Sequence, residues 1–86
     1  IKDGEYFLVN AASNIRSLNK MMNWKIPVEE AKTLNGTILE KLGYIPDQGH
    51  EIELGTYKII IVKTKENAIQ TVRIKEIDPD YKLKAV

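Results

Sequence analysis

Apolar residues in the first part of the chain follow a strand pattern and then a helical one. The aromatic and β-branched run Glu5–Val9 predicts a β-strand that ends at the small, turn-forming residues 10–13. Ser13 or Asn14 can cap the next element, because a side-chain oxygen there accepts from an unpaired backbone N–H at a helix start. That helix carries one apolar face, made of Ile15, Leu18, Met21 and Met22. Pro27 ends it, since proline disfavours helical geometry at the preceding residue.

A second helical pattern follows a polar connector over residues 28–32. From Thr33 onward, Leu34, Ile38, Leu39 and Leu42 share one face. Gly43 suits the left-handed position after a helix end, and Pro46 cannot continue the helix. The dipeptide Asn35-Gly36 elsewhere favours a hairpin. Its flanks here are helical rather than alternating, so we place Gly36 in the first helical turn, where it permits a close backbone approach.

The remaining pattern predicts β-structure. Residues 50–54 alternate with Ile52 and Leu54 inward, Gly55 turns the chain, and residues 57–62 read as a central strand because their middle is apolar on both faces. A polar turn over residues 63–67 leads to a last strand, residues 68–77. A β-bulge near Gln70-Thr71 is expected in it, because the apolar positions there break strict alternation. The order β-α-α-β-β-β predicts a small α+β domain with an antiparallel sheet, and residues 78–86 read as a frayed tail.

Composition limits the function classes. The chain has 86 residues, 43% hydrophobic and 29% charged, with no Cys and a net charge of +1. One small domain is therefore expected, without disulfides, thiolate chemistry or a general attraction to nucleic acid. The longest uncharged stretch, ten residues from Tyr6 to Ile15, is half of a membrane span, so we expect no direct insertion of this domain. Because the chain starts without Met, we interpret it as a piece of a longer polypeptide.

Candidate chemistry is sparse. His50, the only histidine, lies near Asp47, Glu51 and Glu53, a set that could hold a metal or act as a base. In a strand, however, Glu51 and Glu53 point to the face opposite His50. We therefore expect a solvated strand edge, with no catalytic residue and no metal ligand. No nucleophile motif and no phosphate-binding glycine loop is present in the sequence, and the sequon at residues 35–37 is interpreted as chance.

Two surface features leave alternatives open. Met21, Met22 and Trp24 could form an adaptable binding patch, although such a stripe is more often part of the core. Charge is also polarised along the chain: residues 26–55 carry two bases and six acids, whereas residues 56–86 carry seven bases and four acids. This polarity either matches a partner surface of complementary sign or is simply solvated.

One stretch resembles a known family. Residues 33–52, TLNGTILEKLGYIPDQGHEI, resemble the T-x-x-G…L-G-x-I-P-x-x-G signature of the transporter-associated domain of the CorC/HlyC family. The start at residues 3–6, Ile26-Pro27 and the segment 69–74 are also similar to that family, so the resemblance covers residues 3–77. Gly36, Gly43, Pro46 and Gly49 carry the structural signature. Tyr44 stands where the family often has Arg.

The resemblance implies an accessory domain rather than an enzyme, with no cofactor. The fold is expected to be similar to a sub-domain of FAD-binding oxidoreductases. Domains of this family lie at the cytoplasmic face of bacterial membranes, after a transmembrane segment and a pair of CBS domains, in proteins named haemolysins or linked to magnesium and cobalt efflux. The implied partners are those domains of the same polypeptide, with a homodimer left open. The alternative is a module that binds a small ligand or nucleotide, such as a flavin or adenine compound.

Overall fold

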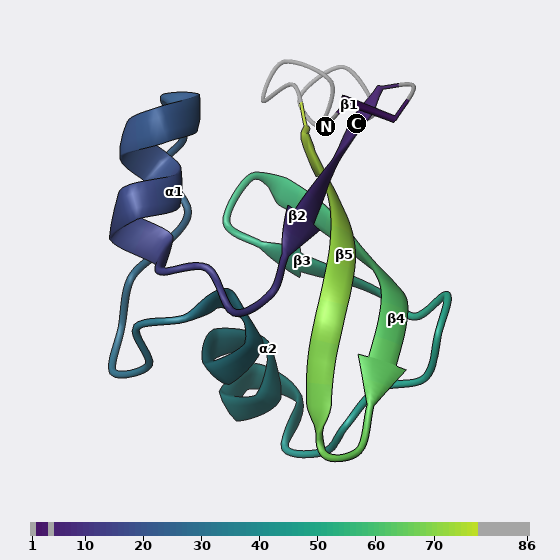
Figure 1. The fold of residues 1–86 in the computed structure, drawn as a ribbon. Coiled ribbons are helices and arrows are strands. Elements are labelled where there is room, and N and C mark those ends of the chain that lie inside the picture. Colours follow the sequence, from purple (N-terminus) through teal and green to yellow (C-terminus); the bar gives the residue numbers. More distant parts are fainter. Residues whose placement is uncertain (1, 4, 78–86) are drawn as a thin grey trace, which may run out of the picture.

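The computed structural model describes residues 2, 3 and 5–77 (Figure 1). Their elements are β1 (Lys2–Asp3), β2 (Tyr6–Asn10), α1 (Ile15–Met22), α2 (Leu34–Leu42), β3 (Glu51–Leu54), β4 (Tyr57–Lys65) and β5 (Ala68–Glu76). The predicted β-α-α-β-β-β order is confirmed, with the short β1 as an addition. The predicted tail, residues 78–86, lies outside the described residues.

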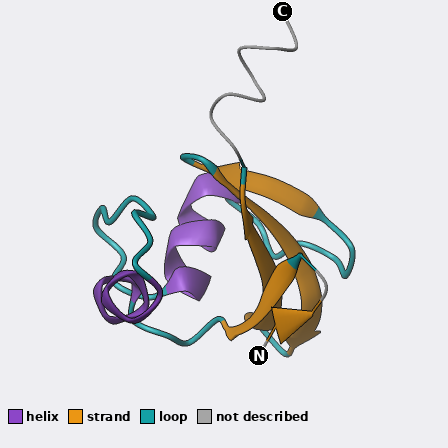
Figure 2. Ribbon diagram, turned by 90° about the horizontal axis from the view of Figure 1, so that it is seen from above, coloured by secondary structure: helices purple, strands orange, loops and turns teal. Residues whose placement is uncertain are grey.

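The five strands form one antiparallel sheet in the order β1-β2-β5-β4-β3. The first long strand, β2, therefore pairs with the last one, β5, and the two helices form the connection that carries the chain from β2 to β3. Both helices lie on the same side of the curled sheet (Figure 2). This arrangement confirms the α+β class and leaves β3 at one edge of the sheet.

The hairpin between β4 and β5 has a shorter turn than predicted, and it has a bulge at the predicted place. The predicted polar turn at residues 63–67 is too long, because Thr64 and Lys65 still pair with Ile69 and Ala68. The register then passes from Thr64↔Ile69 to Lys63↔Thr71, which leaves out Gln70 where a bulge was expected. A second irregularity leaves out Val62 on β4. The two shifts keep the apolar positions of both strands on the helix side.

Both helices begin at a side-chain cap: Asn14 is one of the two predicted candidates for α1, whereas Thr33 was not predicted as the cap of α2. The Asn14 side chain accepts from the Ser17 N–H at 3.1 Å, and the Thr33 hydroxyl accepts from the Gly36 N–H at 3.1 Å. The predicted apolar face of α1 is wrong at Met21, whose side chain is 75% exposed. Six residues span about 240° of helix rotation, so Met21 lies well away from the buried Ile15.

The core lies between the sheet and the helices. Trp24 and Met22 pack against it half-buried, so these residues belong to the core rather than to a binding patch. The Tyr57 ring is 1% exposed, and its hydroxyl accepts from the Lys25 N–H at 2.7 Å. The buried apolar residues are Val9, Ala11, Ile15, Leu18, Ile26, Leu34, Ile38, Ile52, Leu54, Tyr57, Ile59, Ile61, Ile69, Val72 and Ile74.

Candidate functional site

The loop between α2 and β3 contains three of the four signature residues. Gly43 takes the left-handed conformation, with φ 78°, and its N–H donates to the Leu39 carbonyl at 2.8 Å to end α2. Pro46 is fully buried and anchors the middle of the loop. The loop is thus held at its start and at its centre.

The end of this loop is held by a turn and a bulge. The His50 N–H donates to the Asp47 carbonyl at 3.2 Å, which closes a four-residue turn with Gly49 at its third position, φ 85°. A positive φ at that position is what a type II turn requires. Gly49 N–H donates to the Ile61 carbonyl at 2.7 Å, and Ile61 N–H donates to the His50 carbonyl at 2.9 Å, so two residues face one. This bulge sets the register with which β3 enters the sheet.

The fourth signature residue, Gly36, lies in the first turn of α2. A Cβ there would lie 3.0 Å from the Ala31 Cβ and 3.2 Å from the Thr33 hydroxyl oxygen. The absence of a side chain at residue 36 therefore lets the connector before α2 lie against the helix without a shift of Ala31 or Thr33.

Asn35 is a structural residue that the sequence interpretation missed. Its N–H donates to the Ala11 carbonyl at 2.7 Å, and its side-chain oxygen accepts from the Ile69 N–H at 2.8 Å. It thus joins α2 to the end of β2 and to β5. A signal was present: Asn35 lies three, four and seven residues before Ile38, Leu39 and Leu42, on the apolar face, where a polar side chain needs a partner.

His50 is half-buried beside the loop rather than in a metal or catalytic cluster. Its ring meets the Tyr44 ring edge to face, with centroids 6.1 Å apart. Among residues 2, 3 and 5–77, no group of three or more His, Cys, Asp or Glu side chains is arranged to hold a metal ion. Tyr44 and Ile45 next to it are 55% and 41% exposed.

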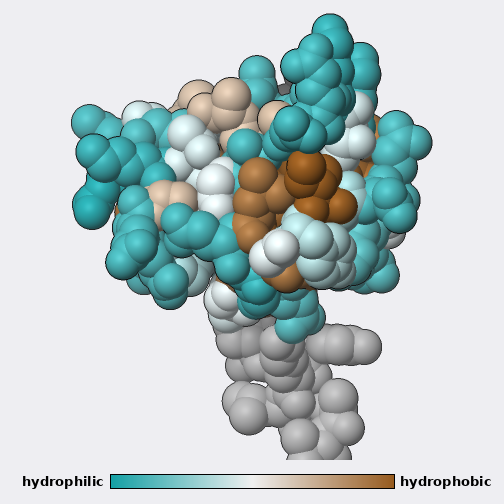
Figure 3. All heavy atoms as spheres, turned by 90° about the horizontal axis from the view of Figure 1, so that it is seen from below, coloured by the Kyte–Doolittle hydropathy of each residue, from teal (hydrophilic) through white to brown (hydrophobic). Residues whose placement is uncertain are grey.

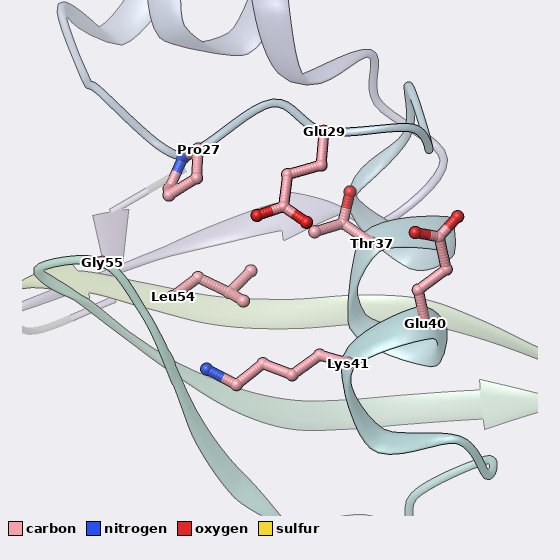
Figure 4. A pocket seen from close by; sticks show the side chains of 7 residues that line it. All are labelled: Pro27, Glu29, Thr37, Glu40, Lys41, Leu54 and Gly55. Carbon is pink, nitrogen blue, oxygen red and sulfur yellow. The ribbon is translucent and has the colours of Figure 1, made fainter.

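A shallow groove of about 320 Å³ lies between α2, the connector and the β3–β4 turn (Figure 4). Glu29 and Glu40 flank Thr37 at its rim, and Leu54 lies at its floor. The Lys41 ammonium points across the groove and donates to the Glu53 backbone carbonyl. This volume is at the lower end of the range for ligand pockets, and no histidine is among the residues that line the groove.

One exposed ion pair joins β3 to β4, and another joins β5 to Glu5, the residue before β2. The carboxylate of Glu51, 2.9 Å from the Lys58 ammonium, raises the pKa of that lysine. The Lys75 ammonium lies 2.7 Å from the Glu5 carboxylate; their hydrogen bond lowers the pKa of Glu5 and raises that of Lys75. Because all four groups are solvent-exposed, these pairs contribute little stability.

Neither helix of the described residues is long and apolar enough to cross a bilayer.

Comparison with known proteins is consistent across sequence and structure. A family model described as the CorC_HlyC transporter associated domain matches residues 1–78. The chain is 36% identical over 72 residues to the UPF0053 inner membrane protein YfjD of Escherichia coli, covering 84% of this chain and 17% of that protein. It is 29% identical over 55 residues to the magnesium and cobalt efflux protein CorC of Buchnera aphidicola, covering 64% and 20%.

The same similarity holds in three dimensions. The crystal structure of a functionally unknown conserved protein from Haemophilus influenzae superimposes with a TM-score of 0.84 at 35% identity, covering 90% of this chain and 96% of that one. The chain therefore covers nearly all of that solved structure, but it spans only about a fifth of the length of the two curated relatives.

Proposed function

Because the chain belongs to the CorC_HlyC family of transporter associated domains, we propose that it is a regulatory domain of a larger membrane protein. The observation that carries this proposal is the match over residues 1–78 together with the small share, 17%, of the inner-membrane relative that the chain covers. A domain of this kind acts by contact: it shifts the equilibrium of attached domains when it binds one of their states better than another.

The arrangement of polar side chains supports a role without catalysis. The only histidine, His50, packs on Tyr44 instead of facing a nucleophile. The groove at Glu29 and Glu40 presents exposed carboxylates, and no histidine is among the residues that line it. The fold instead presents a loop that is held by the Gly43 cap, the buried Pro46 and the turn at residues 47–50.

The finer assignment rests on the relatives' names. A relative is named as a magnesium and cobalt efflux protein, which supports the proposal that the regulated process is transport of divalent cations. We assign residues 3–77 as the regulatory unit, at the cytoplasmic face of the membrane, with the CBS and transmembrane domains of the same polypeptide as its partners. Gly36, Gly43, Pro46 and Gly49 then have the role of setting the backbone geometry of the unit.

Deletion of residues 3–77 from the full-length polypeptide tests the proposal. Cobalt efflux from cells or vesicles is measured for the intact and shortened proteins at equal amounts in the membrane. The deletion is expected to change the rate of efflux or its dependence on cytoplasmic magnesium. Unchanged efflux over the whole concentration range contradicts the proposal.

A ligand-binding role gives a different result in a second assay. The 86-residue chain is heated alone and with FAD, ATP or magnesium, and the unfolding midpoints are compared. A ligand that binds the native state raises the midpoint by mass action. No shift is expected, and a shift of several degrees with FAD or ATP would favour the nucleotide-binding alternative over regulation by contact alone.

A further inference from the structure

The dipeptide Asn35-Gly36 combines a chemically reactive sequence with a tightly held structure. In an unfolded chain, an asparagine before a glycine readily loses its side-chain amide, because glycine has no side chain to hinder attack by its own backbone nitrogen. Asn35 is the only asparagine of the chain that precedes a glycine. The dipeptide is therefore a candidate site for spontaneous covalent modification.

The reaction needs only the chain and water. The backbone nitrogen of Gly36 gives its proton to hydroxide and attacks the side-chain carbonyl carbon of Asn35. A C–N bond forms, and the amide nitrogen takes a proton from water and leaves as ammonia, which produces a five-membered succinimide ring. Water then opens the ring at one of its two carbonyls. One opening gives aspartate, and the other gives isoaspartate, in which the main chain runs through the former side chain.

Both reacting groups are held in other interactions in the folded structure. The Asn35 side-chain oxygen accepts from the Ile69 N–H at 2.8 Å, which holds the side chain against β5. The Gly36 N–H, which must lose its proton, donates to the Thr33 hydroxyl oxygen at 3.1 Å. Ring closure requires the Asn35 side chain to turn back onto the Gly36 nitrogen, so both hydrogen bonds must break first.

The backbone around the dipeptide is anchored as well. The Asn35 N–H donates to the Ala11 carbonyl at 2.7 Å, and both Ala11 and Ile69 are buried. Helix α2 lies beside β5 in the lower half of Figure 1, and Figure 3, which views the molecule from below, shows a hydrophobic area surrounded by hydrophilic side chains at this end. The reaction therefore requires the start of α2, residues 33–36, to separate from β2 and β5.

We propose that Asn35-Gly36 is a gated self-modification site, which is silent while α2 is docked and forms aspartate or isoaspartate when the start of α2 opens. Deamidation is slow compared with local opening and closing, so its rate follows the fraction of chains that are open. This inference goes beyond the proposed regulatory function and does not depend on it.

The two products have different consequences. Aspartate keeps a side-chain oxygen that accepts from the Ile69 N–H. Isoaspartate adds one carbon to the main chain between residues 35 and 36. The Thr33 cap and the bond to Ile69 then no longer fit together, because their spacing along the chain has changed. Isoaspartate formation thus makes a transient opening of α2 permanent.

Incubation of the 86-residue chain at mildly alkaline pH tests the gate. Trypsin cleaves after Lys32 and Lys41, so residues 33–41 form one peptide. Chromatography with mass spectrometry separates its asparagine, aspartate and isoaspartate forms. The native chain is expected to deamidate at least about tenfold more slowly than the same chain unfolded in urea. Equal rates would overturn the proposal, because docking of α2 would then give no protection.

Two variants distinguish local opening from complete unfolding. Thr33→Val removes the hydroxyl that accepts from the Gly36 N–H, and the matched control Ile52→Val removes one carbon from the core at the edge strand β3. Both changes lower global stability by similar amounts. Each native rate is divided by the rate of the same variant in urea. Thr33→Val is expected to raise this ratio about fivefold and Ile52→Val less than about twofold. Equal increases, or no increase in Thr33→Val, would overturn local opening as the gate.

The separated products test whether the opening becomes permanent. Ion exchange isolates the deamidated chains, because both products carry one more negative charge than asparagine. The isoaspartate chain is expected to unfold at least about 5 °C below the unmodified chain, whereas the aspartate chain unfolds within about 3 °C of it. An isoaspartate chain with an unchanged unfolding midpoint would contradict a permanent opening of α2.

Discussion

Replacement of Asn35 by alanine removes the bond that joins α2 to β5. The Asn35 side-chain oxygen accepts from the Ile69 N–H at 2.8 Å, and Ile69 is 3% exposed, so water cannot readily replace the lost acceptor. An unsatisfied buried N–H costs about 2 kcal/mol, and the better helix propensity of alanine returns about 0.5 kcal/mol. The expected loss is therefore about 1.5 kcal/mol, or roughly 6–12 °C in the unfolding midpoint of a domain of this size.

The assay is urea and thermal unfolding followed by the fluorescence of Trp24, the only tryptophan. Asn35→Asp is the matched control, because a carboxylate still accepts from Ile69 and a negative charge is favourable in the first turn of a helix. The Asp variant should stay within about 0.5 kcal/mol of wild type. Equal losses in both variants, or a loss below about 0.5 kcal/mol in the Ala variant, would refute this role for the amide oxygen.

Three further substitutions probe the turn, the helix contact and the buried tyrosine. Gly49→Ala should cost about 1–2 kcal/mol in chemical unfolding because φ is 85°, with Gly49→Asn costing less; equal costs would contradict a conformational cause. Gly36→Ala should destabilise by about 1 kcal/mol, since its Cβ would lie 3.0 Å from the Ala31 Cβ, and Ala31→Gly should reverse the loss in the double variant. Burial raises the pKa of Tyr57, so the folded state holds the phenolic proton more tightly than the unfolded chain. That stability is complete below about pH 10 and is lost as pH rises through the raised pKa, so wild type should lose more stability above about pH 10 than Tyr57→Phe; parallel pH profiles would refute the assignment.

The local elements were predictable because their signals lie close together in the chain. Helix α2 needs only Thr33 at its start, an apolar face and Gly43 at its end, all within eleven residues. The bulge at Gln70 followed from a break in the two-residue period of β5. The prediction was wrong where the spacing of apolar residues fits more than one arrangement. Met21 was placed on the apolar face of α1 but is exposed, and the turn before β5 was predicted longer than it is.

The exposure of Tyr44 and Ile45 could not be predicted from the sequence in the same way. Whether Tyr44 and Ile45 are buried depends on what the sheet and helices leave uncovered, and their neighbours Gly43 and Pro46 gave no indication of it. Asn35 had a detectable signal on the apolar face of α2, yet its partners at Ala11 and Ile69 are 24 and 34 residues away in sequence. Their identity is a property of the packed structure.

By itself, the amino-acid sequence determined the class of fold, the order of its elements, the turns at its glycines and the family resemblance. Each of these depends on residue type and spacing over short range, where backbone sterics and hydrophobic period act directly. Only the tertiary structure decided that β2 pairs with β5, that the Asn35 amide joins a helix to a strand, and that Tyr44 and Ile45 stay exposed. The physical reason is that these features arise when distant segments compete for the same core, and the positions left outside that core follow from the completed packing.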